Sequence, residues 1–231
     1  MYGGSLRTNG REVSLGRPNA LLEYSAISIF IMKFILARKG RMTQVFEEDG
    51  RVNAGTVLTV APNIVTQVKT LATDGYSAVQ IGYDTQKVER LAKAQAGKAF
   101  RVLKEFRIDN PADFTVGAVI PLDAFTEGET IQIAGTSKGK GFMGGVKRHG
   151  FKGGRRTHGQ KHSEHEVGSI GGGGRAGGRV AKGMKMGGRT GSDRVTITNL
   201  KVLRIDAKNG QIIVSGAVPG SPGSLVEIVG Q

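Results

Sequence analysis

The 231-residue sequence contains no cysteine and no tryptophan, and aromatic residues make up only 6% of it. Without cysteine the chain forms no disulfide and offers no thiolate to a metal. No apolar run reaches the roughly 18 residues that a membrane span needs. Acidic residues are also scarce, because 19 Asp or Glu stand against 33 Lys or Arg, and the net charge is +14. This imbalance indicates a polyanionic partner, either nucleic acid or an anionic membrane surface.

The excess charge is concentrated between residues 135 and 191. This segment holds 20 of the 37 glycines and all four histidines, with 13 Lys or Arg against two acids. Its net charge of +11 leaves only +3 for the rest of the chain. So many glycines disfavour an amphipathic helix lying on a membrane. Nucleic acid is therefore the favoured partner.

The segment 135–191 is not expected to fold alone. No helical or strand period links its few large apolar residues, and ordering each residue costs about 1–2 kcal/mol. It is therefore expected to be disordered or to be ordered by a polyanion, whose phosphates Lys and Arg neutralise. A flexible basic linker is the alternative, although such linkers usually mix Ser, Pro, Glu and Lys. This segment has no proline, and Phe and Met recur among its basic residues.

The candidate RNA-binding side chains are the cationic and imidazole groups of this segment. Glycines between them let backbone N–H groups approach a phosphate chain closely. Fully extended, the segment would reach at most about 190 Å, far enough to enter a large RNA. The candidates are Lys138, Lys140, Lys147, Arg148, His149, Lys152, Arg155, Arg156, His158, Lys161, Arg175, Arg179, Lys182, Lys185 and Arg189.

Two glycine patterns in the segment match the fingerprint of a dinucleotide site. They lie at Gly139–Gly144 and Gly172–Gly177. Such matches arise by chance in a glycine-rich segment, and a true site needs a helix after the glycines. The residues from Val146 to Gly154 are not expected to form that helix. A nucleotide site is therefore not predicted.

Metal and catalytic sites are not predicted either. His158, His162 and His165 have a spacing that could suggest zinc, but Gly159 and the absence of cysteine argue against it. No nucleophile–base pair or paired carboxylates can be assembled, so an enzyme is not expected. Glu164 and Glu166 are expected to pair locally with Lys or Arg. No cofactor and no small-molecule substrate are expected.

The rest of the chain from Met32 reads as short strands separated by turns, which indicates a β-barrel or sandwich. The first part has strand-like runs at 32–37, 43–46, 56–60, 64–69, 76–81, 100–108, 114–120 and 130–133. The second part has them at 195–198, 202–205, 211–215 and 225–229. Strands before residue 134 and after residue 192 should pair with each other, so that the basic segment interrupts one β domain.

Local signals refine this prediction. Residues 64–69 are expected to return along 56–60 after the Ala-Pro-Asn turn at 61–63. Asp74-Gly75 and Asn209-Gly210 are hairpin dipeptides. Residues 87–95 are the one stretch of helical composition.

Residues 1–31 have no clear strand or helix period before Asn19. Arginines in front of an apolar run resemble the start of a signal peptide, but the charged region is too long and no A-x-A site follows. A translation start at Met32 would remove the segment, and a disordered extension is the other interpretation.

Motifs along the chain resemble those of bacterial-type ribosomal protein L3, the uL3 family. The resemblance covers about Met32 to Gln231, in order and with family spacing. In the basic segment it rests on Gly135–Phe142 (GTSKGKGF), Val146–Phe151 (VKRHGF), Thr157–Gly159 (THG), Gly168–Gly171 (GSIG) and Val180–Met186 (VAKGMKM). Before that segment it rests on Met42–Phe46 (MTQVF), Val65–Lys69 (VTQVK) and Asp74–Tyr76 (DGY).

The resemblance implies a structural component of the large ribosomal subunit, which is cytoplasmic. It implies a mainly β fold, with a six-stranded translation-protein-type β-barrel, a small α+β insertion and a long irregular extension. Residues 32–134 and 192–231 would form the barrel and its insertion, and residues 135–191 the extension. That extension would bind large-subunit rRNA and reach toward the peptidyl transferase region. A role in early subunit assembly and contacts with ribosomal proteins L14 and L19 are implied too, without membrane binding.

The sequence departs from the family pattern at several places. Residues 1–31 have no family counterpart, and Arg41 stands between Gly40 and the Met-Thr-Gln motif. Glu166 and Val167 occupy positions where the family commonly shows Arg and Pro, and Gly172 stands where some members carry a methylated glutamine.

A free RNA-binding or RNA-chaperone module is the alternative function, and an RNA-modifying enzyme ranks third.

Overall fold

A computed structural model of the chain describes residues 33–95, 97–172, 174 and 177–230. The N-terminal segment 1–31 lies outside the described residues, as do the predictions made for it. Strands dominate the described part, and its helices are short. The mainly β class expected from the sequence is confirmed.

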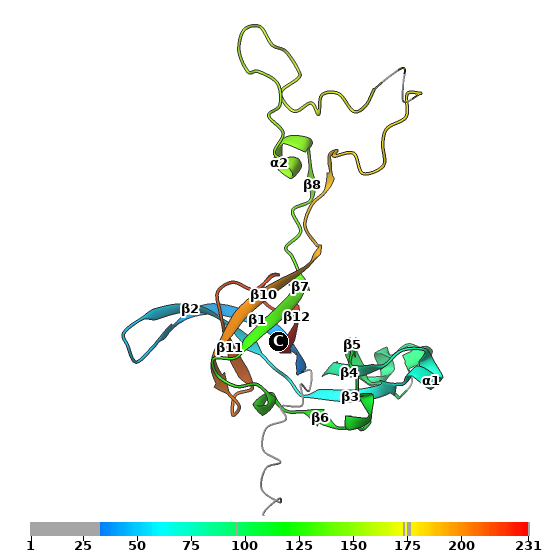
Figure 1. Ribbon diagram of the computed structural model, residues 1–231, viewed down its shortest axis with the longest axis vertical. Coiled ribbons are helices and arrows are strands. Elements are labelled where there is room, and N and C mark those ends of the chain that lie inside the picture. The colour runs from blue at the N-terminus through cyan, green and yellow to red at the C-terminus, as the bar shows by residue number, and fades with distance from the viewer. Residues whose placement is uncertain (1–32, 96, 173, 175–176, 231) are drawn as a thin grey trace, which may run out of the picture. The chain divides into compact units, whose positions relative to one another are not determined.

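Six strands close into a barrel in the order β1, β12, β7, β10, β11, β2, with antiparallel neighbours throughout (Figure 1). Strands from the two sides of the basic segment therefore pair with each other, β12 with β1 and β7, β10 with β7, and β11 with β2, as the sequence predicted. The strands are β1 (Phe34–Phe46), β2 (Val52–Thr59), β7 (Thr130–Thr136), β10 (Arg194–Asp206), β11 (Gln211–Ser215) and β12 (Leu225–Gly230).

Some runs that the sequence separates form one strand. Residues 32–37 and 43–46 contribute to β1, whose pairing with β2 shifts register between Lys39 and Met42. Residues 195–198 and 202–205 join in β10, where the pairing with β7 shifts between Ile197 and Leu200. A bulge lets a strand bend without ending, so the interruption in the apolar pattern marks a bend and not a turn.

The barrel interior is filled by aliphatic side chains of alternating residues. Ile35, Leu58, Ile133, Ile212 and Ile228 are fully buried in one cluster. Burying such a side chain contributes about 1.5–3 kcal/mol relative to leaving it in water. This core takes residues from both sides of the basic segment.

A second sheet of four strands follows the order β5, β4, β3, β6. Its strands are β3 (Asn63–Lys69), β4 (Ala78–Thr85), β5 (Phe100–Arg107) and β6 (Val119–Ile120). The prediction that residues 64–69 return along 56–60 is wrong, because β3 pairs with β4 and β6. The Asn63 side chain, bonded to the backbone of Leu36, holds the chain where it leaves the barrel.

Strand β1 belongs to both cores, because its alternate side chains point to opposite faces. Phe34 and Leu36 pack against Val65, Val79 and other buried residues of the second sheet. The Phe34 ring stacks on Phe106 with centroids 4.6 Å apart. The second sheet is therefore anchored to the outer face of the barrel.

The helix predicted at 87–95 does not form. This stretch has two 3-10 turns, η1 (Val88–Arg90) and η2 (Lys93–Gln95). A nine-residue helix is marginal in water unless it buries an apolar face, and most of these residues are exposed. The four-residue helix α1 (Leu71–Asp74) lies between β3 and β4, and Gly75 ends it with a φ of 77°.

The strand predicted at 114–120 is reduced to β6. Gly117 has a φ of 89° and turns the chain before it. The remaining 3-10 turns are η3 (Pro111–Asp113) and η4 (Leu122–Ala124).

Candidate nucleic-acid interface

The basic segment leaves the barrel as two paired chains between β7 and β10 (Figure 1). The Ser137 N–H donates to the Asp193 carbonyl at 2.9 Å, and the Lys140 N–H donates to the Thr190 carbonyl at 2.8 Å. Pairing resumes between β8 (Phe142–Met143) and β9 (Gly188–Arg189). We call these two chains, residues 137–143 and 187–193, the stalk.

The stalk requires glycine at position 191. Gly191 has a φ of 78°, and a Cβ there would lie 2.1 Å from the Lys138 carbonyl oxygen. A side chain at this position would therefore strain the backbone and push the two chains apart.

A one-turn helix, α2 (Gly145–His149), follows the stalk, although no helix was expected from Val146 onward. Gly150 ends it with a φ of 71°. Arg148 Nη1 donates to the Met186 carbonyl at 3.0 Å, and His149 Nε2 lies 3.0 Å from the same oxygen. These contacts tie the outgoing chain to the returning one.

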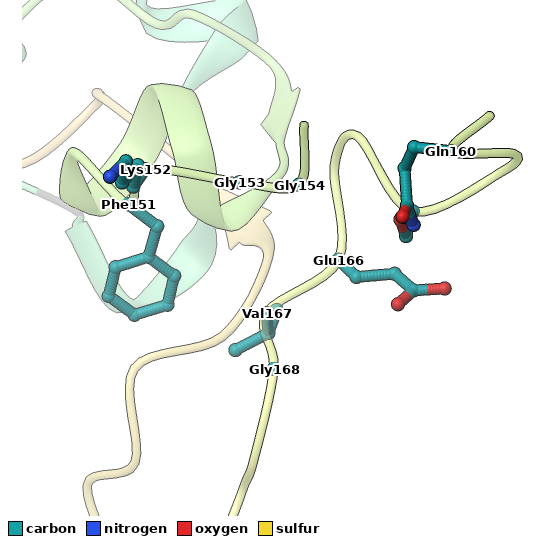
Figure 2. A pocket seen from close by; sticks show the side chains of 9 residues that line it. Phe151, Lys152, Gly153, Gly154, Gln160, Glu166, Val167 and Gly168 are labelled. Carbon is teal, nitrogen blue, oxygen red and sulfur yellow. The ribbon is translucent and has the colours of Figure 1, made fainter. Parts of the chain in front are cut away.

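A small apolar contact lies next to α2. A Cβ on Gly145 would meet the Phe151 ring at 2.8 Å and Val167 at 3.3 Å, so both side chains pack against this glycine. Figure 2 shows Val167 turned toward Phe151, whereas Glu166 points to the other side. A shallow pocket of about 540 Å³ lies between the chain around Gly153 and that around Glu166. This part of the segment therefore has local structure that no period in the sequence predicted.

The cationic side chains of the segment lie in solvent. Every Lys and Arg candidate that the structure describes is exposed, as is His158, and His149 is half-buried. Arg175 lies outside the described residues. The candidates follow the stalk, α2 and the irregular chain beyond it, so they form an extended series and not one compact cluster.

One ion pair is present within the segment among the described residues. Arg156 Nη2 lies 2.6 Å from Glu164 Oε1, which confirms local pairing for Glu164. Among the described residues Glu166 has no ion pair, so its local pairing stays a prediction. Because water screens exposed pairs, the Arg156–Glu164 pair contributes at most about 1 kcal/mol.

The sequence reasoning missed Lys39, which lies beside the base of the stalk. Its Nζ donates to the carbonyl oxygens of Val218 at 2.6 Å and Gly220 at 2.8 Å. Burial, followed by the positive charge of Lys138, lowers the pKa of Lys39. The strand pattern around Lys39 gives no sign of this proximity, since Lys138 is far away in sequence.

None of the helices in the described part of the chain is long and apolar enough to cross a membrane. Within the same residues, no group of three or more His, Asp or Glu is arranged to hold a metal ion.

These features define a β protein whose two adjacent strands carry a long, exposed, basic extension. Known proteins are similar to this chain in sequence. The profile of the family described as ribosomal protein L3 matches residues 51–226. The large ribosomal subunit protein uL3 of Carboxydothermus hydrogenoformans is 44% identical over 203 residues, covering 85% of this chain and 96% of the relative. The uL3 of Nocardia farcinica is 46% identical over 199 residues, covering 83% and 90%.

The uL3 of Vibrio campbellii is 45% identical over 199 residues, covering 83% of this chain and 95% of the relative. The chain belongs to the ribosomal protein L3 family, which confirms the resemblance seen in its motifs. Members of this family are components of the large ribosomal subunit, which in bacteria is cytoplasmic.

Proposed function

We propose that this protein is a structural constituent of the large ribosomal subunit that binds large-subunit rRNA directly through residues 135–191. The observation that carries the proposal is that the basic side chains are exposed and mostly lack acidic partners. All Lys and Arg described in this segment are exposed, and among them only Arg156 has an acidic partner. Cations held apart from acids and presented to solvent are available to phosphates, and their counterions are released on binding.

The shape of the extension supports an RNA partner over an acidic protein. Its charges follow two chains that leave the barrel together, so they can track a phosphate backbone. Exposed Phe142 and half-buried His149 add rings that can stack on unpaired bases.

Finer features follow from the family and are proposals for this chain. The barrel is of the translation-protein type with a small α+β insertion, and the protein has no catalytic role. The extension runs through rRNA toward the peptidyl transferase region and supports early subunit assembly. Ribosomal proteins L14 and L19 are the proposed neighbours.

A charge-matched pair of variants tests the RNA contact. In the first, Lys138, Lys140, Lys147 and Lys152 are replaced by Gln. In the control, four exposed residues outside the extension, Lys87, Arg90, Lys93 and Lys208, are replaced by Gln. Both variants lose the same charge. We expect the first to lose most of its affinity for large-subunit rRNA fragments and the control to lose little. Equal losses would contradict a site on the extension.

Sedimentation distinguishes the ribosomal role from a free RNA-chaperone role. The tagged wild-type chain should remain with large subunits through a high-salt wash. A chain that binds rRNA fragments but is removed by the wash would instead support the free RNA-binding module.

A further inference from the structure

The hairpin of β1 and β2 continues past the point where the barrel ends. Strand β2 pairs with β11 only over Gly55–Thr59, and β1 pairs with β12 only over Phe34–Arg38. Residues 42–46 and 52–56 pair with each other, and the hairpin projects from the barrel (Figure 1). Its far end therefore has two strands and, among the described residues, no third strand beside it.

One face of this hairpin continues the interior face of the barrel. Directly paired residues lie on the same face of a sheet, and that face recurs at every second residue. Met42 pairs with buried Thr56, and Phe46 pairs with Val52, four residues further along each strand. The pair Gln44–Ala54 lies between them on the same face. The interior face of the barrel therefore continues on the hairpin, and apart from Gln44 its projecting side chains are apolar.

These side chains are uncovered. Met42, Phe46 and Val52 are 55%, 68% and 52% exposed. On the opposite face, the base of the hairpin is covered, since a Cβ on Gly55 would meet Ile213 at 2.7 Å. Grouped apolar side chains in solvent mark a surface that another molecule covers.

The charges around this face indicate which kind of molecule covers it. Glu47, Glu48 and Asp49 form the turn of the hairpin and are the one run of three consecutive acids in the sequence. Arg51 neutralises Asp49 at 3.1 Å, which leaves the turn with two negative charges. Such a turn repels an RNA backbone and attracts Lys and Arg side chains, in a chain whose net charge is otherwise strongly positive.

We infer that the face formed by Met42, Phe46 and Val52 docks a second protein of the large ribosomal subunit, one that presents an apolar patch beside Lys or Arg side chains. The inference goes beyond rRNA binding by the extension, and it uses a different surface. It rests on the proposed function only in requiring that the chain enters large subunits, which sedimentation tests separately.

Photocrosslinking in assembled subunits tests the docking face. The full chain carrying Phe46→p-benzoyl-phenylalanine is incorporated into large subunits, which are purified and irradiated. The matched control places the same group at Leu71, an apolar residue that is 72% exposed on α1. We expect position 46 to crosslink to one basic ribosomal protein, and position 71 not to crosslink to that protein. Failure of the chain to enter subunits would count against the proposed function and not against the face.

Other crosslinking results overturn the inference. In subunits that contain the chain, a crosslink from position 46 to rRNA, to a second copy of this chain, to an acidic protein, or to nothing would each contradict it.

Binding to the crosslinked protein, purified alone, provides a second test. Phe46→Ser should weaken binding by roughly 30-fold or more, as expected for an aromatic anchor at the centre of an interface. Leu71→Ser should leave binding unchanged. Because Phe46 is largely exposed, its replacement should not lower the melting temperature. Equal affinity of wild type and Phe46→Ser would refute the docking face.

Glu48→Lys tests the electrostatic part. Glu48 is exposed at the turn, and the substitution should slow association and weaken its dependence on salt. Faster association after this substitution would show that the partner surface is acidic, which contradicts the inference.

Discussion

The side chain of Asn63 and the backbone of Leu36 form two reciprocal hydrogen bonds. The Leu36 N–H donates to Asn63 Oδ1 at 2.9 Å, and Asn63 Nδ2 donates to the Leu36 carbonyl at 3.1 Å. Asn63 is completely buried and stands where the chain passes from the barrel to the second sheet. One amide side chain thus satisfies both backbone groups of Leu36, and it also donates to the Ala61 carbonyl at 2.9 Å.

Asn63→Ala should therefore destabilise the fold strongly. Removal of the amide leaves two buried backbone groups without partners, each at a cost of about 1–3 kcal/mol. We expect the free energy of unfolding to fall by about 2–5 kcal/mol, measured by urea denaturation. Asn53→Ala, on the exposed hairpin, should cost less than about 1 kcal/mol. Similar losses in the two variants would contradict a special role for Asn63.

Glu227 should make stability depend on pH. Burial, which alone would raise the pKa of its carboxyl, is the largest influence, but hydrogen bonds from Arg194 and Lys104 together outweigh it and lower the pKa. A depressed pKa means that the charged carboxylate stabilises the fold above its ordinary pKa, near 4.3, and that this contribution is lost as pH falls through the depressed value.

Glu227→Gln should therefore lower the melting temperature at pH 7, and the difference from wild type should shrink as pH falls below about 4. Glu89→Gln, at an exposed position, should leave the melting curves unchanged. Melting followed by circular dichroism between pH 3 and pH 7 measures both. A difference that grows on acidification would show that the assigned direction of the pKa shift is wrong.

Binding to rRNA fragments should depend steeply on salt. Each neutralised phosphate contributes roughly 0.7–0.9 to the slope of log K against log salt, so six contacts imply a slope near −4 to −5. Filter binding between low and physiological salt measures this slope. A slope shallower than about −2 would mean that most of the exposed Lys and Arg of the extension face solvent in the complex.

Removing most of the extension should leave a folded β domain. The Ser137 N–H and the Asp193 carbonyl are already hydrogen-bonded at 2.9 Å, so a short Gly/Ser linker in place of residues 138–190 can join the strands without strain. A shorter loop also lowers the entropic cost of closure, by about 1 kcal/mol. We expect cooperative unfolding by circular dichroism, together with loss of most rRNA affinity and failure to enter large subunits.

Two results would contradict this division of labour. An unfolded shortened protein would mean that the extension supplies part of the core. A folded one that assembles normally would place the main RNA contacts on the barrel.

Gly191→Ala should disturb RNA binding more than folding. The new methyl group would meet the Lys138 carbonyl at 2.1 Å, in a backbone conformation that strains residues other than glycine. We expect a loss of rRNA affinity with little change in the barrel's melting temperature. Gly144→Ala is the matched control, because nothing lies within 4 Å of a Cβ there and its φ is −71°. Equal effects of the two substitutions would show that the stalk geometry is unimportant.

The sequence predicted the β class, most strands and the pairing across the basic segment, because alternation and β-branched residues are local signals. It could not predict that β3 leaves the barrel, since that depends on the contact between Asn63 and Leu36, which lie 27 residues apart. It predicted a helix at 87–95 from composition alone, without a surface for that helix to bury.

The candidate interface was predictable as a set of residues but not as a geometry. Charge and glycine content identified the segment 135–191. The stalk and α2 depend on backbone pairing between residues about 50 apart, such as Lys140 with Thr190. Packing of Phe151 and Val167 onto Gly145 likewise joins residues that no sequence period connects.

The place of β12 in the barrel has a consequence for biosynthesis. This last strand lies between β1 and β7, so the ring cannot close until residues 225–230 have been made. The basic extension is made before that point. At that stage β7, the strand from which the extension leaves the barrel, still lacks its neighbour β12. A newly made chain thus presents its cations to solvent before it has a finished domain to anchor them. In this period premature contact with any polyanion would compete with folding.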